Sequence, residues 1–114
     1  PVQNVLTFES SQLGNVDIQA NQRCQIFENG NTNQIGLYIN INDIINYNLD
    51  NFYIDANAFI IKSIRSFADD DGYKIQITFF KNHSFTDQDQ IEIKFSGNYK
   101  LDNKVYYIKN ISES

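Results

Sequence analysis

Several residue types are rare or absent in this chain of 114 residues, and each absence narrows what the protein can be. A single cysteine, Cys24, excludes an intramolecular disulfide. One histidine and one cysteine supply too few ligands for a zinc site. The five glycines stand singly, so the chain has no glycine-rich loop to cradle a phosphate. No apolar run approaches the ~18 residues that a membrane span requires.

Positive charge is also scarce. Nine Lys and Arg residues face fourteen Asp and Glu residues, and the formal net charge is −5. We interpret the basic residues as spread along the chain rather than clustered. Because affinity for nucleic acid comes largely from Lys and Arg that neutralise phosphates, direct nucleic-acid binding is not expected.

The opening stretch "PVQNVLTF" lacks the charged and apolar regions of a signal peptide. We therefore expect a chain made in the cytoplasm without such a signal, and a trimmed fragment of a longer protein is the alternative. The absence of a disulfide framework favours a reducing compartment or a bacterial or viral origin. The 16 Asn and 17 Ile residues indicate a low-GC genome, so Asn in a suggestive place carries little weight.

The dominant hydrophobic period is two, with β-branched and aromatic residues at alternating positions, which is typical of half-buried strands. The clearest strand has an apolar face made by Tyr73, Ile75, Ile77 and Phe79. A second has an apolar face made by Ile91, Ile93 and Phe95.

The same criteria predict further strands over 2–8, 16–20, 23–28, 35–41, 58–67 and 104–109. Asn29-Gly30 predicts a hairpin, because both residues tolerate positive φ. The sequence thus predicts an all-β, single-domain antiparallel β-sandwich or barrel of about seven or eight strands. It spans residues 1–114, with at most one short helix near 43–49.

Three consecutive carboxylates, Asp69, Asp70 and Asp71, lie between two predicted strands and precede Gly72. A polar loop that ends in Asp-Gly favours a β-hairpin of three to five residues, exposed to solvent and without an ion. Calcium at these three residues is the weaker alternative, because it needs six to eight oxygens. If the neighbouring strands form a meander, Asp87 and Asp89 lie at the opposite end of the strand from 73 to 80 and cannot complete the site.

Candidate catalytic residues are few. Cys24 lies in an alternating run, where a buried structural thiol is expected. His83 and Ser84 are adjacent, but adjacency is not the geometry of a triad, and we expect a histidine exposed in a turn. We predict no enzymatic activity and no cofactor.

The tyrosines suggest a surface. In "KVYYIKNI" both faces of the predicted strand are apolar, with Tyr106 on one and Tyr107 on the other. One of these faces should meet water in an isolated sandwich, so we expect it to be covered by a partner or a ligand, or else by the domain's own loops. Tyr106, Tyr107 and Tyr99 are our candidates for an interaction surface.

Two functions follow as hypotheses. The first is a non-catalytic structural or interaction subunit of a larger assembly, such as a bacteriophage virion component (capsid decoration, head, neck or tail) or part of a bacterial surface machine. Its partners would be other proteins or further copies of itself. The alternative is a carbohydrate-binding β-sandwich module, which the tyrosines favour and the absence of Trp disfavours.

Overall fold

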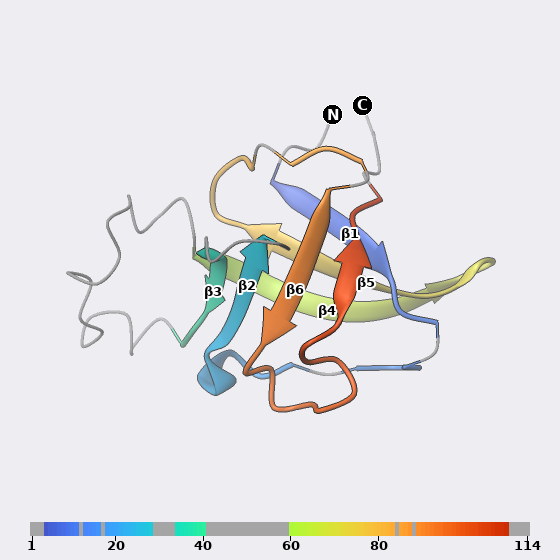
Figure 1. The fold of residues 1–114 in the computed structure, drawn as a ribbon, viewed down its shortest axis with the longest axis horizontal. Helices are drawn as coiled ribbons and strands as arrows, with labels where there is room; N and C mark the ends of the chain where they lie inside the picture. Colours follow the sequence, from blue (N-terminus) through green and yellow to red (C-terminus); the bar gives the residue numbers. More distant parts are fainter. Residues whose placement is uncertain are drawn as a thin grey trace.

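The computed structural model describes residues 4–11, 13–16, 18–28, 34–40, 60–83, 85–87 and 89–109. These residues form seven strands in two antiparallel sheets and no α-helix (Figure 1). The strands are β1 (Val5–Glu9), β2 (Cys24–Glu28), β3 (Gln34–Tyr38), β4 (Ile61–Asp69), β5 (Gly72–Phe79), β6 (Gln90–Lys94) and β7 (Val105–Tyr107), and a 3-10 turn, η1, covers Ala20–Gln22. The all-β prediction is confirmed.

The three-stranded sheet has the order β1-β5-β4, with β5 in the centre. Leu6 lies opposite Ile77 and Phe8 opposite Ile75, so the apolar faces of β1 and β5 coincide. The β4–β5 hairpin closes where Asp69 pairs with Gly72, which leaves a loop of only two residues. Figure 1 shows this hairpin projecting beyond the body of the molecule.

The four-stranded sheet has the order β3-β2-β6-β7. Ile26 lies opposite Ile93, which aligns the apolar faces of β2 and β6. A bulge between Ile26 and Phe27 shifts the register of β2 against β3. The antiparallel pairing of these two strands confirms the predicted hairpin, whose turn residues lie outside the described ranges.

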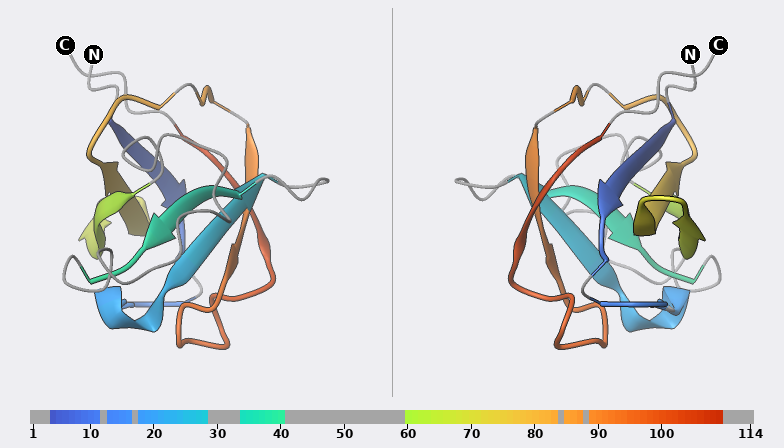
Figure 2. Two further views of the ribbon diagram at one scale, coloured as in Figure 1. Left: turned by 90° about the vertical axis from the view of Figure 1, so that its left-hand side faces the viewer. Right: turned by 90° about the vertical axis from the view of Figure 1, so that its right-hand side faces the viewer.

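One isolated β-bridge joins the two sheets at each of two places, but the sheets are not closed into a barrel. Ile108, directly after β7, bridges to Phe8, and the Lys109 N–H donates to the Thr7 carbonyl oxygen at 2.7 Å. Leu37 bridges to Ile60 on the other side. The strands of one sheet run across those of the other (Figures 1 and 2), as in orthogonal sheet packing.

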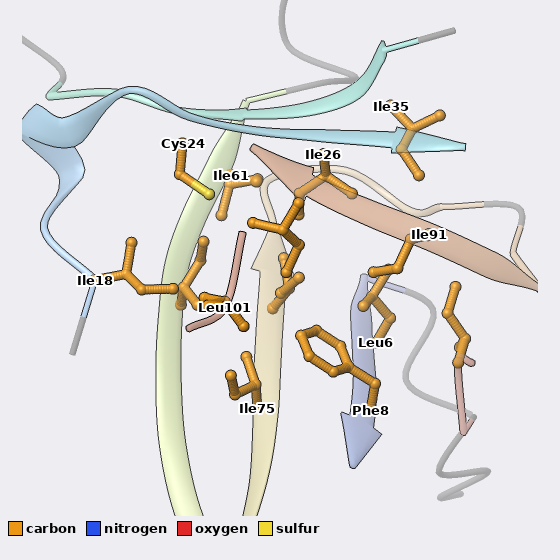
Figure 3. Close-up of a cluster of buried hydrophobic side chains, with 14 of the residues drawn as sticks. Leu6, Phe8, Ile18, Cys24, Ile26, Ile35, Ile61, Ile75, Ile91 and Leu101 are labelled. Atoms are coloured by element: carbon orange, nitrogen blue, oxygen red, sulfur yellow. The ribbon is translucent and has the colours of Figure 1, made fainter. Parts of the chain in front are cut away.

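The core lies between the sheets. Figure 3 shows side chains from both sheets converging there, with Leu6, Phe8 and Ile75 from one sheet and Cys24, Ile26 and Ile91 from the other. All six are 0–1% exposed.

One place in this core requires glycine. A Cβ on Gly36 of β3 would lie 3.0 Å from Ile61 Cδ1 and 3.2 Å from Phe79 Cε1, both on the opposite sheet. The absence of a side chain therefore permits the close approach of the sheets near β3 and β4.

Several sequence predictions need correction. The predicted strand 16–20 is absent: Val16 and Ile18 are buried, which explains the alternation, but the described residues there pair with no strand and lead into η1. The meander is also wrong, because β5 and β6 belong to different sheets. The predicted helix near 43–49 lies outside the described residues.

Two aromatic residues of the predicted apolar faces are more exposed than expected. Tyr73 lies near the projecting end of the hairpin and is 37% exposed. Phe95 follows the last residue of β6 with φ of 60°, which turns the chain out of the strand and leaves the side chain 63% exposed.

Candidate interaction surface

The loop between β6 and β7 is held rigidly by its own polar groups. The Asp102 carboxylate accepts from the Ser96 N–H at 3.1 Å, and the Asn98 N–H donates to Ser96 Oγ at 3.1 Å. The Asn98 carbonyl accepts from the N–H groups of Leu101 and Asp102. Leu101, which is fully buried, anchors the loop in the core. The backbone of this loop is therefore preorganised.

This rigid loop presents aromatic rings to solvent. Tyr99 is 83% exposed, and the exposed Phe95 has a left-handed backbone that bulky residues rarely adopt. Such strain costs about 1–3 kcal/mol and is often found where a residue is held for binding. Sequence reasoning missed Phe95 as a surface residue, although the turn-forming run Ser96-Gly97-Asn98 directly after it signals the end of the strand.

The outer face of β7 carries two further exposed apolar side chains. Val105 is 46% exposed and Tyr107 is 52% exposed. In the neighbouring strand β6, Glu92 lies opposite Val105 and Gln90 lies opposite Tyr107, so these four residues are on the same outer face of the sheet. We define the 95–107 surface by its exposed side chains: Phe95, Tyr99, Lys100, Lys104, Val105 and Tyr107.

Tyr106 faces the opposite way. Its ring lies 4.5 Å from the ring of Phe8, centre to centre, and its hydroxyl donates to the Leu101 carbonyl oxygen at 2.8 Å. Burial, and then the charge of Asp102, raises the pKa of the Tyr106 hydroxyl to about 12. Of the three predicted tyrosines, the structure therefore places Tyr99 and Tyr107 on the surface and Tyr106 against the core.

The 95–107 surface lies in the most basic segment of the sequence, and two of that segment's lysines, Lys100 and Lys104, belong to the surface. Residues 94–109 contain four lysines and one carboxylate, Asp102, whereas all other residues together carry five basic and thirteen acidic side chains. The interpretation that basic residues are spread evenly was wrong. The signal was visible in the sequence as Lys94, Lys100, Lys104 and Lys109.

The three-aspartate stretch forms the β4–β5 turn. Asp69 Oδ1 accepts from the Asp71 N–H at 2.9 Å, and both Asp69 oxygens lie 2.6 Å from Lys74 Nζ. The Lys74 hydrogen bond is the main reason that the pKa of Asp69 is lowered. Asp69 is thus engaged within the hairpin, while Asp70 and Asp71 are exposed. The predicted turn is present but has two loop residues, not three to five.

Lys74 itself is 7% exposed on the outer face of the three-stranded sheet. It also lies 3.6 Å from Glu9, which pairs with Lys109 at 3.1 Å. A lysine side chain with so little exposure is tolerated because two carboxylates, Asp69 and Glu9, lie beside its ammonium group. The network connects β1, β5 and the residues after β7.

The expectation of a solvent-exposed His83 is wrong. Its Nε2 lies 2.7 Å from the Val5 carbonyl oxygen, and its Nδ1 accepts from the Phe85 N–H at 3.1 Å. The ring stacks on Phe85 with 5.5 Å between centres. In the neutral tautomer that carries the proton on Nε2, both contacts are satisfied. The histidine therefore fastens the loop after β5 to β1.

Cys24 is fully buried, and burial is the first cause that raises the pKa of its thiol to about 12. Thiolate is the reactive form, so this thiol is inert at neutral pH. The predicted structural role is consistent with this environment. No group of three His, Cys, Asp or Glu residues in the described ranges could hold a metal ion.

One hollow lies beside the interaction surface. It has a volume of about 260 Å³ and is lined by Glu9, Ser10, Ser11, Leu13, Lys104 and Tyr106. Ser10 Oγ is buried there and has no hydrogen-bond partner among the described residues. A carboxylate, hydroxyls and an aromatic ring can together recognise a small polar ligand.

Comparison with known proteins gives no match to any protein-family model, curated protein or solved structure. In the described part of the chain, no helix has the length and hydropathy needed to span a membrane.

Proposed function

We propose that this protein is a non-catalytic interaction subunit of a larger assembly and that the 95–107 surface is the contact it makes. The observation that carries the proposal is the exposure of Phe95 and Tyr99 at a hydrogen-bonded loop, together with the exposure of Tyr107 on the outer face of the adjoining β7. Aromatic rings on a preorganised backbone bind with little loss of conformational entropy, and aromatic residues are enriched at interfaces.

The most specific form of the proposal is a bacteriophage virion component, such as a capsid decoration, head, neck or tail protein, or part of a bacterial surface machine. It would be made in the cytoplasm and incorporated in a particle. A small all-β domain with an inert cysteine and a fastened histidine supports a structural role over a catalytic one.

The test is photo-crosslinking in the organism that encodes the chain. A photoreactive phenylalanine analogue replaces Tyr99 or Tyr107, and Lys62, which is exposed on β4, serves as the matched control position. We expect adducts from positions 99 and 107 to subunits of one particle, recovered in the particle fraction, and none from position 62. A chain recovered only as free protein without adducts would contradict the proposal.

The hollow beside Tyr106 favours a second candidate, carbohydrate binding. Its Glu9 carboxylate can accept hydrogen bonds from sugar hydroxyls, and the exposed Ser11 hydroxyl beside it can donate or accept. This function predicts millimolar or tighter binding of a saccharide that Ser11→Ala weakens and Tyr107→Ala does not. The interaction-subunit function predicts no such binding.

A further inference from the structure

Two exposed parts of this protein have complementary chemistry. The first is the 95–107 surface, which combines aromatic rings with Lys100 and Lys104. The second is the end of the β4–β5 hairpin, which we call the hairpin tip and define by the exposed residues Ala68, Asp70, Asp71 and Tyr73. We propose that the hairpin tip of one copy docks on the 95–107 surface of another copy. This inference rests on the proposed function and names the partner as the chain itself.

The charges of the two surfaces support this pairing. Three lysines, the exposed Lys100 and Lys104 and the half-buried Lys94, lie on or beside the 95–107 surface. They outnumber the two carboxylates there, Asp102 in the loop and Glu92 opposite Val105. At the hairpin tip, Lys74 neutralises Asp69 but leaves Asp70 and Asp71 facing solvent. Docking brings these opposite charges together at the rim of an apolar contact, where they determine orientation and the rate of association.

The apolar parts of the two surfaces also match. Ala68 and Tyr73 are register partners just behind the acidic turn, and Tyr73 is 37% exposed. On the other surface, Phe95 and Tyr99 are held out by the hydrogen-bonded loop. Tyrosine suits such a contact, because its ring is apolar and its hydroxyl can reach water or a polar group at the rim.

The positions of the two surfaces determine what kind of assembly results. Figure 1 shows the hairpin tip at the end of the molecule's long axis and the loop after β6 at the edge below β6 and β2, so the two are separate. Each copy can therefore use its tip on one neighbour and its 95–107 surface for another. Such a heterologous contact builds a ring or a filament rather than a closed pair.

The experiment reverses charge on each surface in turn. The loop variant carries Lys100→Glu and Lys104→Glu, the tip variant carries Asp70→Lys and Asp71→Lys, and Lys62→Glu is the control at an exposed site of the same charge. Sedimentation velocity measures association, and thermal unfolding verifies that each variant folds. Each reversal should weaken self-association about tenfold or more, because like charges then face each other, while the control should not.

Mixing the variants makes the test decisive. The loop variant then has two acidic surfaces and the tip variant two basic ones, so the two variants should associate with each other in an equimolar mixture although neither associates alone. A chain with all four substitutions should self-associate again. Folded variants that associate as the wild type does, or a mixture without a complex, would overturn the proposal.

Other occupants give different results. Single-stranded nucleic acid also binds surfaces that combine aromatic rings with lysines. A chain that does not self-associate but binds a labelled poly(dT) oligonucleotide would overturn the self-docking, provided that the loop variant loses this binding and the tip variant keeps it. Adducts from Tyr99 to a different particle protein, with a monomeric purified chain, would overturn self-docking and leave the interaction-subunit function standing. Free monomer without adducts would overturn both.

Discussion

Cys24 is the residue whose chemistry depends most on its burial. The thiol is enclosed by apolar side chains of both sheets, and its ionisation would place a charge in the core near Asp102. The pKa of the folded-state thiol is accordingly raised from 9.0 to about 12. The thiol should resist iodoacetamide in the native protein at pH 8 and react once the chain is unfolded.

The same residue predicts a pH dependence of stability. Below pH 9 the thiol is protonated in both the folded and the unfolded state, so its ionisation does not reduce the free energy of unfolding. As the pH rises from 9 towards the folded-state pKa of about 12, the thiol ionises in the unfolded state only, and the free energy of unfolding falls. The expected loss is about 1 kcal/mol by pH 10. Urea unfolding of the wild type and Cys24→Ala between pH 8.5 and 10 measures it. Parallel profiles for the two proteins would contradict the raised pKa.

Phe95 combines an exposed side chain with a strained, left-handed backbone conformation. Asn tolerates the left-handed backbone better than Phe, and little apolar burial is lost because the Phe95 side chain is 63% exposed. We expect Phe95→Asn to raise the free energy of unfolding by about 0.5–1 kcal/mol while weakening self-association. Denaturant unfolding and sedimentation measure the two effects. A variant that loses stability would show that Phe95 is not strained.

At the scale of the strands, stability depends on which face of the sheet a residue occupies. Ile93 in β6 is fully buried, and Ile93→Ala should cost about 2–5 kcal/mol through lost burial and a cavity. Val105→Ala, on the exposed face of neighbouring β7, should change stability by less than about 0.5 kcal/mol. Chemical denaturation compares the two. Similar costs for both would contradict the assignment of the faces.

The period-two pattern predicted the strands well because alternation is a local property of the sequence. It identified β5 and β6, whose inward residues Ile75, Ile77, Ile91 and Ile93 are all fully buried. It failed at 16–20, where Val16 and Ile18 alternate into the core without a hydrogen-bonded partner strand. Which strands pair could not be predicted, since the pairing of β1 with β5 connects residues about seventy positions apart.

The surface was predictable only in part. Apolar residues on both faces of the last strand correctly indicated that one face is exposed, but composition could not decide that Tyr107 rather than Tyr106 lies there. That choice depends on the register of β6 against β7, which places Tyr106 opposite buried Ile91. The exposure of Phe95 depends on its positive φ. The turn-forming residues after it indicate that the strand ends there, whereas the hydrophobic alternation alone predicts that the strand continues through Phe95.

For the whole molecule, the distribution of charge matters more than its sum. The formal net charge of −5 conceals a basic, aromatic segment, residues 94–109, within an otherwise acidic chain. An acidic and apolar hairpin projects elsewhere on the same molecule (Figure 1). Opposite surfaces on one small domain favour repeated contacts between identical copies, and salt should weaken these contacts by screening.

Sedimentation velocity of the unmodified chain, from micromolar to near-millimolar concentration at low and high salt, tests this account most directly. We predict a sedimentation coefficient that rises continuously with concentration at low salt and returns towards the monomer value at high salt. A strictly monomeric protein at every concentration, or a dimer that salt does not affect, would contradict the account.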